Sequence, residues 1–232
     1  MQPADLRSFL EALLEKLSSN RCTKLSGDEE GVLTRLNVLT EDVYQKTLGG
    51  GICFSTLVPL ALRAVELGAD PEEVSKFLSW ADFEVLVTRY LSKSGFTVFR
   101  GVRFTKRRFE IDVLGIDEVS RLCLVIDCKH WKPGYRKSGK LRIVAQEHSA
   151  KIEELARECG FIMPKYPALA RAEYLVPVIV TLTQVLKGAI NGAVIVPILS
   201  FRDFIANLTY YVDVFRSEIL VRNPCFLSRR CV

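Results

Sequence analysis

Apolar residues in the first 80 positions recur at the spacing of an α-helix. The clearest stripe consists of Leu6, Phe9, Leu10, Leu13, Leu14 and Leu17. Residues three and four apart share one face of a helix, so this stripe predicts an amphipathic helix. Polar or glycine-rich segments at 26–31 and 49–51 interrupt the pattern, and Asp70 followed by Pro71 is typical of another helix start. We therefore expect residues 1–79 to form an all-helical N-terminal domain.

From Trp80 the pattern changes to short β-rich runs between helices. Gly95 ends the first helical pattern, and the segment 117–120 is typical of a hairpin turn. The expected order is a helix at 80–94, strands at 96–99, 109–116 and 122–128, a helix at 142–159, strands at 178–182 and 193–199, and a last helix capped by Ser200. This order predicts an α/β domain over residues 80–232.

Hydropathy, charge and cysteine content narrow the class of protein. The most apolar region, 175–201, is interrupted by Pro177, Lys187 and Pro197, so it predicts two buried strands and no membrane span. The net charge of +5 is compatible with nucleic-acid binding without requiring it. The seven cysteines include no Cys-x-x-Cys pair and follow no secretory signal peptide. We therefore expect no disulfide framework and a cytoplasmic protein.

Two acids and a lysine are expected at the ends of two neighbouring strands. Because side chains alternate along a strand, Asp127 and Lys129 share one face. Asp112, in the preceding strand, shares a face with Glu110 and Leu114, and a hairpin of this length places Asp112 beside Asp127. Adjacent carboxylates repel each other unless a cation lies between them, and their oxygens suit Mg²⁺ or Mn²⁺. The lysine adds a positive charge that can stabilise an oxyanion or hold an attacking water.

The order of these residues resembles a known nuclease pattern. Glu84 in a helix, Asp112 in the segment 109–115 and Asp127-Cys128-Lys129 resemble the PD-(D/E)xK pattern of the restriction-endonuclease-like superfamily. Residues 81–207 are similar in particular to the Mrr-like restriction enzymes and, more distantly, to the archaeal Holliday-junction resolvases. The resemblance implies a restriction-endonuclease-like core, which is a mixed central sheet flanked by helices, and a Mg²⁺-dependent endodeoxyribonuclease of restriction, repair or recombination.

The resemblance also implies roles for individual residues. Asp112 and Asp127 are expected to bind the metal ion, with the carbonyl of Cys128 as a further ligand. Lys129 is expected to orient or activate the attacking water. Glu84 is expected to contact the metal ion or its water, and it lies at the edge of the apolar face of its predicted helix.

The sequence departs from the family pattern at few positions. Ile111 stands in place of a proline, and Asp127 is an aspartate where glutamate is commoner. Neither change removes a carboxylate, although the shorter Asp127 shifts the metal position by about one methylene. Gln146 matches a glutamine that Mrr-like relatives carry after the lysine, but it lies nearly opposite the buried face of its predicted helix.

Basic residues flank the acidic strands and predict contacts with DNA phosphates. Those expected to bind nucleic acid are Arg103, Lys106, Arg107, Arg108, Lys132, Arg136 and Lys137, together with Gln146. Aromatic residues between them, such as Trp131 and Tyr135, are suited to stacking on bases or sugars. One active site in each chain would favour a symmetric dimer for a cut in both strands.

Other interpretations of the same residues remain open. Cys128, His130 and His148 are too few and too differently directed for a convincing zinc or thiol–imidazole site, and His148 is expected to be a packed core histidine. The sequence also fits a nucleic-acid-binding protein of the same fold without turnover. A third alternative is an interaction protein in which the acidic cluster and the basic loops are only solvated surface.

Overall fold

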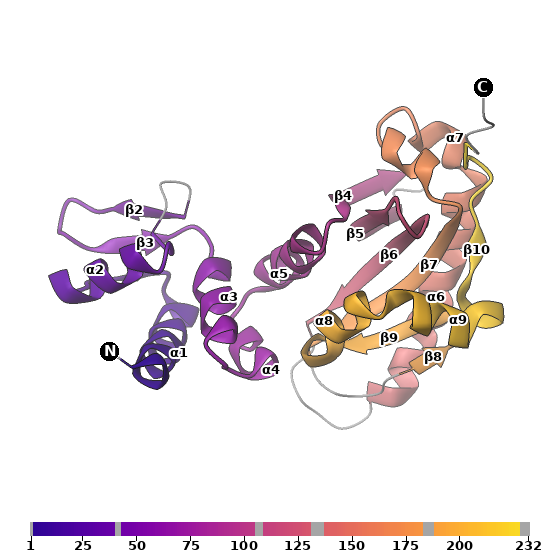
Figure 1. Ribbon diagram of the computed structural model, residues 1–232. Helices are drawn as coiled ribbons and strands as arrows, with labels where there is room; N and C mark the ends of the chain where they lie inside the picture. The colour runs from indigo at the N-terminus through magenta and orange to yellow at the C-terminus, as the bar shows by residue number, and fades with distance from the viewer. Residues whose placement is uncertain (1, 40–42, 105–108, 131–136, 183–187, 228–232) are drawn as a thin grey trace. The chain divides into compact units, whose positions relative to one another are not determined.

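The computed structural model describes residues 2–39, 43–104, 109–130, 137–182 and 188–227 (Figure 1). The chain forms two compact units, Met1–Leu86 (unit 1) and Val87–Val232 (unit 2). The division falls inside helix α5 (Trp80–Lys93), whereas the sequence pattern placed the change of domain at the first residue of this helix.

Unit 1 combines helices with a small antiparallel sheet. Its elements are α1 (Pro3–Ser19), β1 (Cys22–Thr23), α2 (Gly27–Arg35), β2 (Tyr44–Lys46), β3 (Ile52–Phe54), α3 (Val58–Glu66) and α4 (Pro71–Ser75). The strands pair in the order β1-β3-β2. The expectation of an all-helical N-terminal part is therefore wrong. Strands of two or three residues are too short to produce an alternating pattern that the sequence reveals.

Local sequence signals nevertheless set several helix ends in unit 1. The Asp70 side chain accepts hydrogen bonds from the backbone N–H groups of Glu72 and Glu73, so it caps α4 as expected. At the start of α2, Ser26 and Glu29 bond to each other's backbone N–H groups and form a capping box. Leu10, Leu14 and Leu17 of the α1 stripe are fully buried, because this stripe faces the core of unit 1.

Two disulfide bonds correct the expectation drawn from the cysteine spacing. Cys22 and Cys53 are paired residues of β1 and β3 and are joined by one bond. Cys159 and Cys225 are joined by the other, within unit 2. The spacing of cysteines along a chain carries no information about cross-strand register, so pairs separated by 31 and 66 residues could not be read from it. Cys123 and Cys128 are buried thiols.

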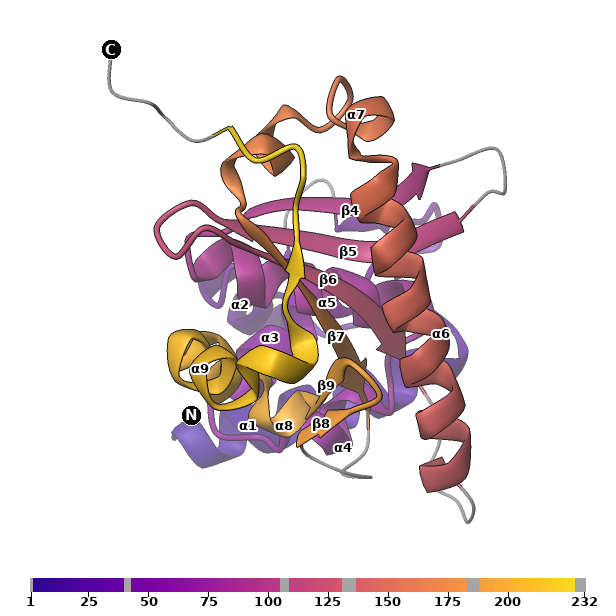
Figure 2. The same cartoon turned by 90° about the vertical axis from the view of Figure 1, so that its right-hand side faces the viewer.

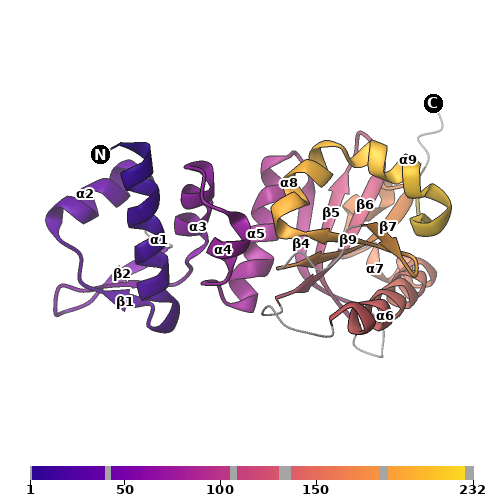
Figure 3. The ribbon, with the colours of Figure 1, turned by 90° about the horizontal axis from the view of Figure 1, so that it is seen from below.

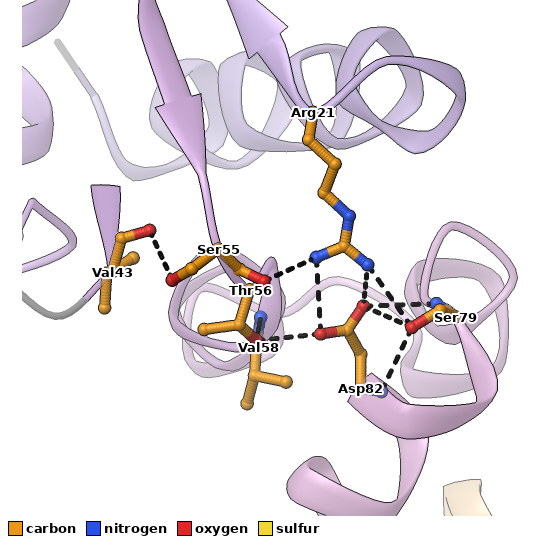
Figure 4. Close-up of polar contacts among 7 residues, drawn as sticks. All are labelled: Arg21, Val43, Ser55, Thr56, Val58, Ser79 and Asp82. Atoms are coloured by element: carbon orange, nitrogen blue, oxygen red, sulfur yellow. Dashed lines mark hydrogen bonds and ion pairs between the residues drawn. The ribbon is translucent and has the colours of Figure 1, made fainter. Parts of the chain in front are cut away.

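A partly buried ion pair connects Arg21, which precedes β1, to Asp82 at the start of α5 (Figure 4). Arg21 Nη2 lies 2.5 Å from Asp82 Oδ2, and Arg21 Nη1 donates to the carbonyl of Ser55 at 3.1 Å. Asp82 also accepts hydrogen bonds from the hydroxyls of Thr56 and Ser79, both at 2.8 Å. Every oxygen of this carboxylate therefore has partners, as a buried charge requires.

Removing the Arg21 charge is expected to destabilise unit 1. Burial raises the pKa of Asp82, but hydrogen bonds from Arg21, Ser79 and Thr56 outweigh it, so the pKa lies below its usual 3.8. Arg21→Met leaves a buried carboxylate without its partner, and we expect a loss of about 3 kcal/mol in the free energy of unfolding. Urea unfolding at pH 7 measures this loss, and Arg7→Met, which changes a partly exposed arginine of α1, is the control.

The same pair makes stability depend on pH. Because the folded-state pKa of Asp82 is depressed, its contribution is present above the unfolded value of 3.8 and is lost as the pH falls through the lower folded value. The thermal midpoint of the wild type should therefore fall below about pH 4 more steeply than that of Asp82→Asn, which has no carboxyl group to protonate. Equal slopes for the two proteins would contradict this assignment.

Unit 2 is built on a mixed seven-stranded sheet. After α5 it contains β4 (Thr97–Phe104), β5 (Phe109–Asp117), β6 (Leu122–Lys129), α6 (Lys137–Arg157), α7 (Cys159–Ile162), the 3₁₀-helix η1 (Pro167–Arg171), β7 (Tyr174–Thr181), β8 (Gly188–Ile190), β9 (Ala193–Pro197), α8 (Ile198–Ala206), α9 (Leu208–Ile219) and β10 (Val221–Arg222). The strand order is β4-β5-β6-β7-β9-β8, and β10 pairs with the start of β7. This confirms the α/β class with a mixed sheet flanked by helices.

The directions of the strands follow from their connections. β4, β5 and β6 follow one another closely along the chain and are antiparallel. The connection from β6 to β7 runs through α6, so these two strands are parallel, as are β7 and β9. The turn between β5 and β6 is stabilised by Asp117, whose carboxylate accepts from the backbone N–H groups of Val119 and Ser120.

Helices cover both faces of this sheet. α6 lies on one face, and α8 and α9 lie on the other (Figures 2 and 3). Ile152 and Leu155 of α6 pack in one core cluster with Val125 of β6. On the opposite face α5 packs closely on β5, because a Cβ atom at Gly115 would lie 2.9 Å from Leu91 Cδ1. Helix packing on both faces of the sheet therefore fixes the positions of β5 and β6, which carry Asp112 and Asp127.

Candidate active site at the ends of β5 and β6

The register of β5 and β6 brings Asp112 to Asp127. The ladder ends with the pair Val113 and Ile126, so Asp112 and Asp127 are the next residues on their strands and lie opposite each other. The Asp112 Oδ2 atom accepts a hydrogen bond of 2.7 Å from the backbone N–H of Cys128. The Asp112 carboxylate thus lies at the end of β6, next to the backbone of Asp127, as the hairpin pattern predicted.

The alternation of side chains along β5 changes at Asp112. Ile111 and Leu114 belong to the same core cluster although they are three residues apart, which a regular strand would place on opposite faces. Gly101 of β4, which has a φ of 58°, lies between the two residues that pair with Ile111 and Val113. The expectation that Asp112 shares its face with both Glu110 and Leu114 assumed a regular strand, and the strand is irregular here.

Asp127 and Lys129 form an ion pair in a largely buried position. The Lys129 Nζ atom lies 2.7 Å from Asp127 Oδ2, and the side chains are 23% and 8% exposed. Within the described part of the chain, no group donates a hydrogen bond of good geometry to this Oδ2 atom. The partner of this Oδ2 atom in the described part of the chain is therefore the Lys129 ammonium group, which lies at 2.7 Å.

The end of β7 lies beside Lys129. In the parallel ladder Lys129 pairs with Thr181, and the backbone N–H of Leu182 donates to the Lys129 carbonyl at 3.1 Å. Thr181 is 1% exposed. The backbone on both sides of the Asp127–Lys129 segment is therefore fixed, on one side by the Asp112 carboxylate and on the other by β7.

A histidine of α6 lies against the same strand. His148 is 1% exposed, and its Nε2 atom lies 2.8 Å from the carbonyl oxygen of Val125. Burial lowers its pKa and outweighs the nearby charge of Asp127, which acts in the opposite direction. The structure confirms that His148 is buried, but it also gives this side chain a specific polar contact with β6, which the sequence did not reveal.

The acidic residues offer the donor types that a hard divalent ion prefers. Asp112 and Asp127 supply carboxylate oxygens, and the buried Oδ2 oxygen of Asp127 has Lys129 Nζ at 2.7 Å. Among the described residues, no group of three or more His, Cys, Asp and Glu side chains is arranged to hold a metal ion. The two aspartates thus fit Mg²⁺ or Mn²⁺ as a partial ligand set that water or a substrate phosphate would complete.

Other predicted site residues lie in different surroundings. Glu84 is half-buried in α5 and belongs to unit 1, whereas Asp112 and Asp127 belong to unit 2, so its predicted role stays a prediction. Arg103 is exposed and pairs with Glu110 at 3.1 Å, and Gln146 is exposed on α6. Lys106, Arg107, Arg108, Lys132 and Arg136 lie outside the described residues, and Lys137 is described only as the first residue of α6.

Comparison with known proteins does not assign a family. No family model matches the sequence. The chain is 28% identical over 140 residues to an uncharacterized protein of Archaeoglobus fulgidus, a match that covers 60% of this chain and 98% of that protein. The crystal structure of protein VC1899 from Vibrio cholerae is 16% identical and superposes with a TM-score of 0.35. That match covers 91% of this chain and spans 52% of the length of VC1899.

Charge is distributed very unevenly between the two units. Unit 1 contains eight Lys and Arg and fourteen Asp and Glu, a net charge of −6. Unit 2 contains 24 Lys and Arg and thirteen Asp and Glu, a net charge of +11. The modest overall charge therefore conceals a strongly basic unit, and this is the unit that contains Asp112, Asp127 and Lys129.

Proposed function

We propose that this protein is a metal-dependent nuclease that hydrolyses phosphodiester bonds in DNA. The single observation that carries the proposal is the meeting of Asp112, Asp127 and Lys129 at the ends of two neighbouring strands. Two carboxylates and an ammonium group in one place suit the hydrolysis of a phosphodiester. The carboxylates would bind a metal cation that activates water, and the ammonium group would stabilise negative charge on the phosphate. The order α5-β4-β5-β6-α6-β7 also fits the restriction-endonuclease-like core that the sequence resembles.

Each residue of the candidate site has a distinct role in this proposal. Asp112 and Asp127 would hold Mg²⁺ or Mn²⁺, which when bound lowers the pKa of a water ligand. Lys129 orients the attacking water and offsets negative charge that develops on the phosphate oxygens. The hydrogen bond from the Cys128 N–H holds the Asp112 carboxylate in place, so its ligand oxygen needs no reorganisation. The Cys128 carbonyl remains a proposed further ligand, and the role of Glu84 stays a prediction of the sequence resemblance.

The charge distribution supports DNA as the substrate of unit 2. A net charge of +11 attracts a phosphate backbone, whereas the −6 of unit 1 repels one. We therefore assign the phosphate contacts to the basic residues of unit 2, including Arg103 and the predicted basic loops. A symmetric dimer belongs to the same proposal. A cytoplasmic location stays a prediction, and the cysteine spacing no longer supports it, because two disulfide bonds are present. No helix among the described residues is both long enough and apolar enough to cross a membrane.

A substrate panel tests this proposal directly. Purified protein is incubated with labelled supercoiled plasmid, a four-way junction, a flap and single-stranded DNA, with Mg²⁺, Mn²⁺ or EDTA. We expect cleavage of at least one DNA substrate in the presence of either metal ion, with 5′-phosphate and 3′-hydroxyl products, and none in EDTA. Intact substrates under all metal conditions would contradict the nuclease assignment.

Nucleic-acid binding without turnover is the second candidate. The observation that favours it is the short contact between Lys129 and Asp127, which partly neutralises one of the proposed ligands. In this case gel-shift binding would be lost steeply between 50 and 200 mM salt, by about 1,000-fold if six phosphates are contacted, while no plasmid is nicked. Binding that is unaffected by salt would contradict both candidates.

A further inference from the structure

The buried face of α6 contains one polar side chain. This face consists of Leu141, Ala145, His148, Ile152 and Leu155, which follow one another at alternating steps of four and three residues. Leu141 and Ala145 pack over β7 and β9, and Ile152 and Leu155 pack in the cluster that contains Val125. A leucine at position 148 would continue this apolar face, so the histidine requires an explanation.

The hydrogen bond to Val125 fixes the tautomer of His148. A carbonyl oxygen only accepts hydrogen bonds, so Nε2 must carry the proton and donate it. The other nitrogen, Nδ1, is buried and has no hydrogen-bond partner in the described part of the chain. In the neutral ring Nδ1 is an acceptor, and leaving such an atom buried and unsatisfied is destabilising. The burial that lowers the pKa of His148 agrees with a neutral ring.

The bond from His148 reaches the strand immediately before the candidate site. Val125 lies two residues before Asp127 and therefore shares its face of β6. The buried Asp127 Oδ2 atom, which has Lys129 Nζ at 2.7 Å, accordingly belongs to the face of the sheet that His148 covers. A leucine in place of His148 would avoid the cost of the unsatisfied Nδ1 atom but would leave the Val125 carbonyl without this donor.

We propose that His148 is a positioning residue for the Asp127–Lys129 end of β6. Its Nε2–H group anchors the Val125 peptide and so fixes the direction of the Asp127 carboxylate, two residues further along. This inference rests on the proposed function, because it gives His148 a role in holding a metal ligand.

Metal affinity separates this role from a purely structural one. The probe is Mn²⁺, titrated by calorimetry into protein from which metal ions have been removed. Glutamine reaches as far as histidine and donates through its own Nε2, so His148→Gln should bind Mn²⁺ within about twofold of the wild type. His148→Leu keeps the packing but loses the donor, and we expect Mn²⁺ binding to weaken 10–100-fold, as is typical when a group that orients a metal ligand is removed.

The control is a core change one turn away on the same face of α6. Ile152→Val should lower the thermal midpoint and leave the Mn²⁺ affinity unchanged. If His148→Leu does not fold, His148→Asn replaces it, because asparagine is too short to place a donor at the position of Nε2. Unchanged Mn²⁺ affinity in His148→Leu or His148→Asn would overturn the role of His148 alone. A wild type that binds no Mn²⁺ would overturn the proposed function and this inference with it.

Discussion

Replacing Asp127 with asparagine is expected to reduce metal-dependent DNA cleavage about 1,000-fold or more, since several kcal/mol of transition-state stabilisation are lost with a metal ligand. Asparagine has the size of aspartate but no charge, so Lys129 loses its partner and the metal ion loses an anionic oxygen. Asp112→Asn should have the same effect, because the amide oxygen still accepts from the Cys128 N–H while the charge is gone.

The measurement is the initial rate of plasmid nicking in Mg²⁺ or Mn²⁺, with the thermal midpoint of each variant determined alongside. Glu110→Gln is the matched control, since Glu110 lies on the same hairpin, is exposed and pairs with Arg103 rather than with Lys129. This control should cleave at the wild-type rate. Full activity in Asp127→Asn, or equal losses in Asp127→Asn and Glu110→Gln, would remove the basis for the proposed site.

Most of unit 2 follows from short-range patterns in the sequence. The β-rich runs around Asp112 and Asp127 predicted β5 and β6, and the turn residues between them predicted the hairpin. The register that places these two aspartates opposite each other also follows, because a short turn between two strands leaves few alternatives. The sequence resemblance added roles for these residues that periodicity alone does not provide.

Features that depend on long-range contacts could not be read from the sequence. β10 has two residues and pairs with β7 only because the chain returns across unit 2. The His148 ring lies on an apolar helix face, and nothing in the sequence indicates that its partner is the carbonyl of Val125. The change of face at Asp112 lies opposite Gly101 of a neighbouring strand, whose backbone is left-handed. Each of these contacts is decided by tertiary packing rather than by local preference.

The difference in net charge between the two units bears on the role of unit 1, which its helical pattern alone leaves open. Helices and a small sheet are compatible with either DNA reading or protein association. A net charge of −6 opposes contact with phosphates, so protein association is the better interpretation of unit 1. The basic residues near the acidic strands and the +11 of unit 2 then belong to one function, the binding of the substrate that Asp112, Asp127 and Lys129 would cut.

The stability of unit 2 should depend strongly on the disulfide bond between Cys159 and Cys225, which ties down its C-terminal segment. Breaking a cross-link between residues 66 positions apart is expected to lower the free energy of unfolding by about 4 kcal/mol, because the unfolded chain regains the freedom that the loop closure removed. Cys225→Ser should show this loss in urea unfolding without reductant, and the double variant Cys159→Ser/Cys225→Ser should show the same loss.

Hydrogen bonds that hold the same segment provide the control for this loss. The buried Asn223 side chain donates to the carbonyls of Leu169 and Ala172, at 2.9 and 2.8 Å, and these bonds remain when Cys225 is replaced. The variant should therefore keep its native fold at low temperature, and a reductant should destabilise the wild type but change the double variant less. Equal stability of the wild type and Cys225→Ser, both without reductant, would show that the cross-link contributes nothing.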